Sequence, residues 1–141
     1  MNKPIKALLW LWQLPQNAIG LALILLLKAE KREWPHNGAK IAYWQFGRRG
    51  RLSRALSGCA FGGIILLPPR GDYAETVPHE HGHAIQSRML GPLYLPVVGL
   101  PSLANNIRAR NDRRVAKTYY KRYPEAWADR LGGVEREGGI N

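Results

Sequence analysis

The chain is poor in cysteine and has no internal repeat. Its single cysteine, Cys59, leaves no intramolecular disulfide framework, which excludes a small disulfide-stapled scaffold and favours a reducing compartment. The absence of a repeat excludes a solenoid, and no glycine-rich loop of the nucleotide-binding kind is present. At 141 residues the chain fits one domain that is long enough to bury a core.

Acidic residues are also few. The chain has 10 Asp and Glu against 21 Lys and Arg, which gives a formal net charge of +11. Such an excess favours anionic partners, either nucleic acid or the phosphate surface of a membrane. No recognisable nucleic-acid motif is present, so we expect an anionic lipid surface and keep a nucleic-acid binder as an alternative.

A run of 21 residues without charge, Ala7 to Leu27, is long enough to span a bilayer. Polar residues and a proline interrupt its middle and predict a kink: Gln13, Pro15, Gln16 and Asn17. Three interpretations remain open, namely a kinked spanning helix, two helices lying in one leaflet, and a cleaved signal peptide. We expect residues 1–37 to form a membrane-associating segment. If it spans, the basic residues after it place the rest of the chain in the cytoplasm.

Residues 38–69 are typical of strands separated by a basic turn. Ala39 to Phe46 alternates apolar and polar residues, and Gly58 to Leu67 is an apolar run closed by two prolines, so we predict two or three strands. The turn between them carries four arginines, which either bind phosphates or stay solvated: Arg48, Arg49, Arg51 and Arg54.

The spacing H-E-x-x-H in His79-Glu80-His81-Gly82-His83 is the main chemical signal. On a helix the two outer histidines share one face and can bind one metal ion, with Glu80 beside them. We predict a helix from Thr76 to Leu90, with Pro78 in its first turn. A catalytic zinc needs three protein ligands, so a third must come from elsewhere. Glu125 and Asp129, four apart on a second predicted helix, are candidates.

These two segments resemble those of gluzincin metallopeptidases of the zincin group, especially membrane-bound zinc endopeptidases. Residues 76–85 resemble the extended zincin signature, except that Pro78 stands where that signature excludes proline, and residues 125–132 resemble E-x-x-A-D-x-x-G. The resemblance implies Glu125 as the third Zn²⁺ ligand and Asp129 as hydrogen-bond acceptor for His79. It also implies peptide or membrane-protein substrates.

A catalytic zinc site requires the same residue types. Two neutral imidazoles and one carboxylate leave zinc with a net positive charge, which lowers the pKa of a water toward about 7. Glu80 would take the proton from this water and pass it to the leaving amine. A second carboxylate, here Asp129, fixes the tautomer of a ligand histidine.

Two further segments have open interpretations. Residues 91–103 are apolar with three prolines and two glycines, and they dip into the membrane, form the wall of a substrate groove, or connect elements within the core. Residues 108–122 are basic and are followed by Tyr123, which suits an anionic leaflet or a nucleic-acid groove. One of Tyr119, Tyr120 and Tyr123 is a candidate donor to the oxyanion of the reaction.

We therefore predict a small α+β zincin-like domain over residues 38–134, with the N-terminal segment 1–37 and a flexible tail at 135–141. A short sheet should pack on the His79 helix, and the Glu125 helix should close the metal site. The predicted function is zinc-dependent peptide hydrolysis at a membrane, with the metal site on the cytoplasmic side. The alternatives are an inactive zinc-binding interaction protein and a basic membrane protein whose histidines are incidental.

Overall fold

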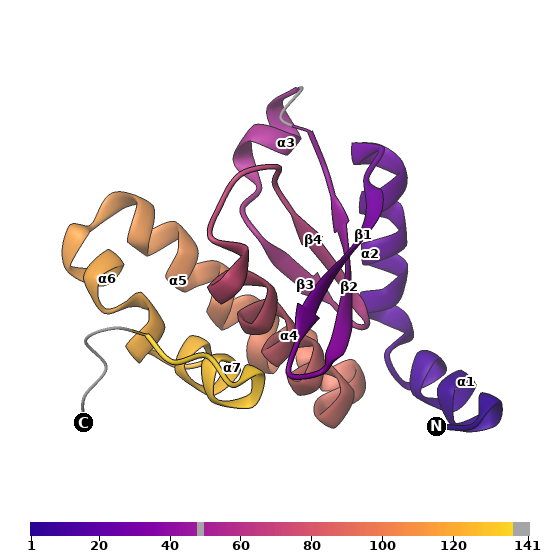
Figure 1. The fold of residues 1–141 in the computed structure, drawn as a ribbon. Helices are drawn as coiled ribbons and strands as arrows, with labels where there is room; N and C mark the ends of the chain where they lie inside the picture. The colour runs from indigo at the N-terminus through magenta and orange to yellow at the C-terminus, as the bar shows by residue number, and fades with distance from the viewer. Residues whose placement is uncertain (48–49, 137–141) are drawn as a thin grey trace.

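The computed structural model describes residues 1–47 and 50–136, and in these ranges the fold is mixed α+β (Figure 1). One sheet contains the four strands β1 (Glu30–His36), β2 (Ala39–Gln45), β3 (Cys59–Phe61) and β4 (Ile64–Leu67). The seven α-helices are α1 (Lys3–Trp12), α2 (Leu14–Leu27), α3 (Arg51–Ala55), α4 (Tyr73–Leu90), α5 (Leu100–Asn111), α6 (Arg113–Lys117) and α7 (Glu125–Gly132). A π-helical turn, Leu95–Gly99, precedes α5.

The sheet has the strand order β1-β2-β4-β3, so β3 lies at one edge. Strands β1 and β2 are antiparallel, β2 and β4 are parallel, and β3 and β4 are antiparallel. The predicted strand at Ala39–Phe46 is β2. The apolar run at residues 58–67 forms a hairpin of two short strands, because Gly62 adopts a positive φ of 65° that favours glycine.

The sequence analysis did not identify β1, which falls in the segment expected to associate with a membrane. An Asn37-Gly38 turn with φ of 49° and 76° joins β1 to β2, and all seven residues of each strand pair. This combination is the preferred two-residue hairpin connection. Residues 30–36 therefore belong to the sheet, and the hairpin crosses the expected boundary at residue 37.

The two faces of the sheet are covered by different helices (Figure 1). Side chains of β4 alternate between them: Ile65 and Leu67 join the core that includes Val77 of α4, whereas Ile64 and Leu66 pack toward α2. The residues of α2 on that side are Leu23, Ile24 and Leu27. The N-terminal apolar segment thus contributes one layer of the domain.

The predicted kink in this segment is present, since α1 and α2 meet at 88° around Gln13. Gln16 donates hydrogen bonds to Ser87 Oγ (2.9 Å) and to the Gly91 carbonyl (2.7 Å), and Asn17 accepts one from the Gly63 amide (3.0 Å). Among the described residues no helix has by itself the length and apolar character to cross a membrane, and the bent α1–α2 pair meets that criterion only as a pair.

Helix α4 begins earlier than predicted. Asp72, not Thr76, is the N-cap, because its carboxylate accepts a hydrogen bond from the Ala74 amide (3.1 Å). Pro78 therefore lies within the helix and not in its first turn, yet α4 continues unbroken to Leu90. In the basic turn, Arg48 and Arg49 lie outside the described residues, while Arg51 and Arg54 belong to α3.

Helices α4 and α7 cross at a contact that only glycine permits. A β-carbon at Gly82 of α4 would overlap the backbone carbonyl of Ala128, and one at Gly132 of α7 would overlap the carbonyl of Pro78. The two backbones thus touch directly. This contact places the start of α7 beside the histidines of α4.

We expect Gly82→Ala to lower the free energy of unfolding by about 3 kcal/mol or more, the upper range for overpacking, because the methyl group meets rigid backbone. In an exposed helix the same substitution raises the free energy of unfolding by about 1 kcal/mol. The sign of the measured change therefore distinguishes a tight contact from an exposed position. Urea unfolding of the purified variant measures it. Gly63→Ala is the control, since nothing lies within 4 Å of its β-carbon position; equal stability of the two variants would contradict the contact.

Candidate metal site

The crossing of α4 and α7 brings together three potential metal ligands, His79, His83 and Glu125. The Oε2 atom of Glu125 lies 3.2 Å from His79 Nε2 and 2.9 Å from His83 Nε2. All three ligand atoms lie within 4.8 Å of one another. A tetrahedral site with bonds of about 2.0–2.1 Å separates its ligand atoms by about 3.3–3.4 Å. The group is thus close to the spacing that one small cation requires.

The outer atoms of the three ligands are held by hydrogen bonds. His79 Nδ1 lies 2.6 Å from Asp129 Oδ1, and His83 Nδ1 lies 2.7 Å from Gln86 Oε1. Ser102 of α5 donates a hydrogen bond to the other carboxylate oxygen of Glu125 (2.5 Å). Such partners orient ligand side chains and fix the histidine tautomer with Nε2 free for a metal.

The site is buried and its electrostatics favour a cation. Glu125 is fully buried, and His79 and His83 are each 4% exposed. Burial alone would lower the pKa of His79, but hydrogen bonds to Asp129 and Glu125 outweigh it and raise that pKa to about 9. Burial opposes ionisation of Glu125, yet the two histidines hold the pKa of its carboxyl well below the usual range. The carboxylates that stabilise a proton here would also stabilise a metal ion.

Glu80 lies beside this group and is 5% exposed. Its Oε2 atom is buried and has no hydrogen-bond partner among the described residues. Burial raises the pKa of Glu80, against the opposing charges of His83 and His79. A buried carboxylate oxygen without a partner is costly, and a cation or polar ligand at the site would offset that cost. The buried His-His-Glu group, with Glu80 next to it, fits a metal ion.

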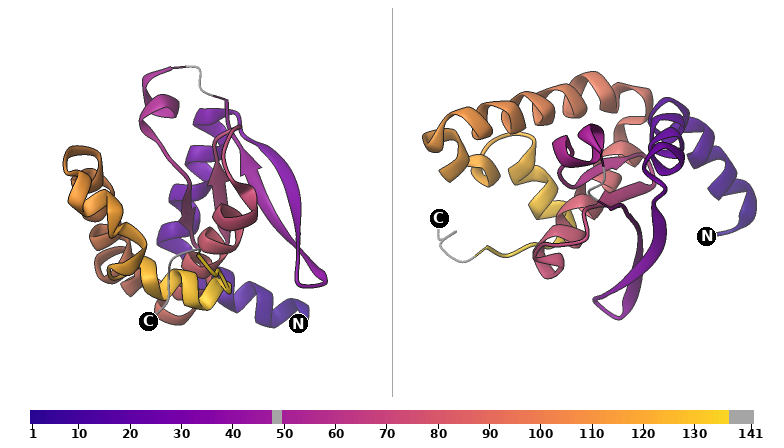
Figure 2. Two further views of the ribbon diagram at one scale, coloured as in Figure 1. Left: turned by 60° about the vertical axis from the view of Figure 1, so that its left-hand side comes forward. Right: turned by 90° about the horizontal axis from the view of Figure 1, so that it is seen from above.

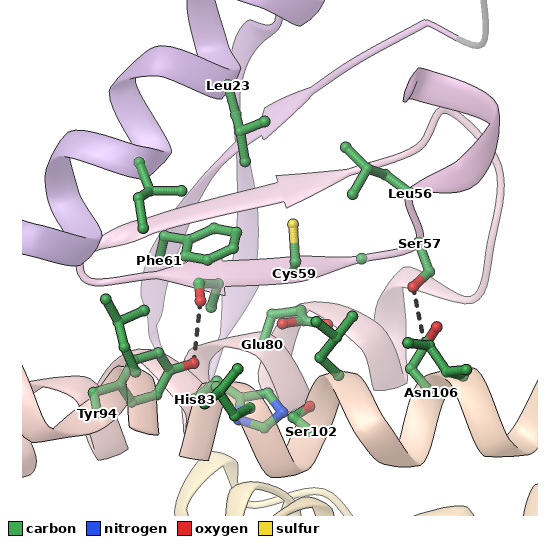
Figure 3. Close-up of a pocket in the computed structure, with 18 of the residues that line it drawn as sticks. Leu23, Leu56, Ser57, Cys59, Phe61, Glu80, His83, Tyr94, Ser102 and Asn106 are labelled. Atoms are coloured by element: carbon green, nitrogen blue, oxygen red, sulfur yellow. Dashed lines mark hydrogen bonds between the residues drawn. The ribbon is translucent and has the colours of Figure 1, made fainter. Parts of the chain in front are cut away.

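A pocket of about 890 Å³ opens onto these residues and is lined mostly by apolar side chains of α2, β3, the π-helical turn and α5 (Figure 3). Two hydrogen bonds hold its walls: Tyr94 donates to the Ala60 carbonyl (3.1 Å), and Asn106 donates to Ser57 Oγ (3.3 Å). The apolar segment at residues 91–103 therefore forms one wall of this pocket, one of the arrangements expected for it.

The start of the expected flexible tail is anchored by Arg136. Its guanidinium donates to both carboxylate oxygens of Asp129 (2.6 and 3.0 Å) and pairs with Glu75 Oε2 (2.9 Å). It also lies 3.3 Å from the centre of the Tyr120 ring, which packs edge-on against His79. Residues 137–141 of that tail lie outside the described residues.

The two other histidines and the three candidate tyrosines do not belong to the His79, His83 and Glu125 group. His81 is half-buried and is not part of the triad, and His36 ends β1 and contacts Asn37. Of the three tyrosines, only Tyr119 lines the pocket, because Tyr123 bonds the Val97 carbonyl (2.6 Å) and Tyr120 packs on His79.

Three residues that support the ligands were not predicted from the sequence: Gln86, Ser102 and Arg136. Gln86 follows His83 by three positions on the same helix, and this spacing places it within reach of the ring. No local pattern marks Ser102 or Arg136, because each reaches the site from another part of the chain.

No protein-family model, curated protein or solved structure matches this chain. The resemblance to gluzincin peptidases thus depends on the two sequence motifs. What the structure adds to them is the possible metal-binding triad of His79, His83 and Glu125.

We expect Zn²⁺ to stabilise the protein through these ligands. At a free concentration of 100 times the dissociation constant, a metal bound only by the folded state adds about 2.7 kcal/mol of stability, or about 10 °C in melting temperature. Thermal unfolding with and without Zn²⁺ measures this shift. The shift should be lost in Glu125→Ala and retained in Glu33→Ala, whose side chain is exposed on β1; an equal shift in both variants would place the metal elsewhere.

We expect Arg136→Gln to weaken Zn²⁺ binding by about tenfold, the lower end for outer partners of metal ligands, because Asp129 loses the cation that orients it toward His79. Competition with a chromophoric chelator gives the affinity. Arg130→Gln removes an exposed arginine from the same region and serves as the control. Unchanged affinity in Arg136→Gln would show that Asp129 is positioned without it.

Proposed function

We propose that this chain is a zinc-dependent metallopeptidase. The observation that carries the proposal is the convergence of His79, His83 and Glu125 beside Glu80, in an apolar pocket. The buried Oε2 atom of Glu80 has no hydrogen-bond partner among the described residues. Two imidazole nitrogens and one carboxylate form a ligand set of catalytic zinc sites, in which a fourth position stays open. Calcium and magnesium prefer sites made of oxygen ligands alone, so this donor set favours zinc.

The residues around the triad have distinct roles in hydrolysis. Zinc would supply Lewis acidity, which polarises the scissile carbonyl and makes a water molecule acidic near neutral pH. Glu80 takes one proton from that water while the water oxygen forms a bond to the carbonyl carbon. Glu80 then delivers the proton to the amide nitrogen as the carbon–nitrogen bond breaks. Burial raises the pKa of Glu80, which makes this carboxylate a stronger base than one in water.

Two features of the pocket support a peptide as the substrate. Strand β3 is an edge strand that lines the pocket, and an extended peptide can pair with such an edge through its backbone. Tyr119 lines the same pocket, and burial together with the charge of Glu125 raises the pKa of its hydroxyl, which stays protonated. Tyr119 is therefore the candidate donor to the negative charge that develops on the carbonyl oxygen.

The experiment compares Glu80→Gln with the wild-type protein on a mixture of quenched fluorescent peptides. We expect Glu80→Gln to retain zinc and to lose turnover by a factor of about 10² to 10⁴, the usual contribution of a general base. His79→Ala and Glu125→Ala should lose both zinc and turnover. Zinc content is measured by atomic absorption on the same preparations.

Glu33→Gln is the matched control, because this glutamate is exposed on β1 and pairs with Lys40 (3.4 Å). A wild-type protein that binds zinc but cleaves no peptide would support the alternative of an inactive zinc-binding interaction protein. Turnover that survives in Glu80→Gln would contradict the role given to this carboxylate.

A further inference from the structure

The pocket has an apolar rim that is exposed on the surface of the molecule. Four residues, which we call the apolar rim, both line the pocket and are exposed: Ile19 (38%), Leu100 (63%), Leu103 (55%) and Ile107 (51%). Ile19 comes from α2, and the other three come from α5. A contiguous exposed apolar patch usually marks a contact surface.

More apolar surface adjoins the rim along the chain. On α2 the side that faces away from the sheet exposes Leu21, Leu25 and Leu26. The segment between α4 and α5 exposes Leu93 and, in the π-helical turn, Val97. None of the ten residues of α1 is buried, although the helix is rich in Leu and Trp. A helix of this length is marginal in water without a packing partner. These elements gain stability if an apolar phase covers them.

The basic residues next to the apolar rim indicate which kind of apolar phase covers it. From the last turn of α5 through α6 the chain exposes Arg108, Arg110, Arg113, Arg114 and Lys117, and none of them forms an ion pair within the described part of the chain. Exposed basic side chains next to apolar ones match an anionic bilayer, whose surface attracts positive charge. A second copy of this chain would present the same positive charge, and the net charge of +11 opposes that pairing.

We propose that the apolar rim docks on an anionic bilayer, so that the pocket opens toward lipid. On the proposed function, the peptide to be cleaved then enters from the lipid side. This assigns α5 to the membrane contact together with the N-terminal helices, and it makes the entrance of the pocket part of that contact.

The test places a polarity-sensitive fluorophore on a single cysteine at Leu103, Leu11 or Ala39, each in a Cys59→Ala background. Leu103 belongs to the rim, Leu11 to α1, and Ala39 lies at the tip of the β1–β2 hairpin, which points away from α5 (Figure 2). Each labelled protein is mixed with phosphatidylglycerol vesicles, with phosphatidylcholine vesicles, or with buffer. Quenching by lipid-attached nitroxide and by aqueous iodide reports the depth of the label.

On phosphatidylglycerol vesicles we expect the label at residue 103 to be quenched by the lipid nitroxide and protected severalfold from iodide, as for a side chain about 5–10 Å into the interface. The label at residue 39 should stay open to iodide. Protection at 103 should fall severalfold on phosphatidylcholine or in high salt. Protection at residue 11 but not at 103 would overturn the proposal, because α1 alone would then dock. Protection at 103 in buffer that rises with protein concentration would also overturn it, in favour of a second copy.

These measurements need neither zinc nor turnover. Docking of the rim in a protein without peptidase activity would leave the membrane contact intact and refute only the proposed function. Turnover by a protein whose apolar rim does not dock would refute the membrane contact and leave the proposed function intact.

Discussion

The direct contact between the backbones of α4 and α7 is the constraint on which the candidate metal site depends. Gly82 and Gly132 face carbonyl groups of the opposite helix with no room for a side chain. At this distance Glu125 reaches His83, which lies 42 positions before it in the sequence, and Asp129 reaches the outer nitrogen of His79. A methyl group at either glycine would overlap the opposite backbone, so the two helices would have to move apart and the spacing of the three ligands would change.

This arrangement places several carboxylates in or near the buried interior of the domain. Neighbouring side chains pair with some of their oxygen atoms but not with all of them. Asp129 and Glu75 share the guanidinium of Arg136, and Glu125 is bonded by His79, His83 and Ser102. The Oε2 atom of Glu80, a residue that lines the apolar pocket, has no hydrogen-bond partner within residues 1–47 and 50–136. Groups that cost stability in the folded protein are expected where the function needs them.

The sequence motifs contain the three residues of the possible metal-binding triad, whereas part of the fold around them was not predicted. The H-E-x-x-H spacing predicts two ligands on one face because a helix places His79 and His83 one turn apart. This local rule needs no tertiary information. By contrast, β1 is rich in charged residues and exposed, so hydrophobic alternation does not reveal it, although Asn37-Gly38 is a hairpin signal. Ser102 and Arg136 act through long-range contacts, which no local pattern encodes.

The apolar residues of α2 have two kinds of surroundings. Leu23 of α2 packs toward the sheet and also lines the pocket, while Leu25 and Leu26 of the same helix are exposed. Here Gln16 and Asn17, which make the segment look too polar for a simple membrane span, fasten α2 to α4 and to the β3–β4 turn. The polar residues thus anchor the helix to the domain, and its leucines remain available both to the core and to an external apolar phase.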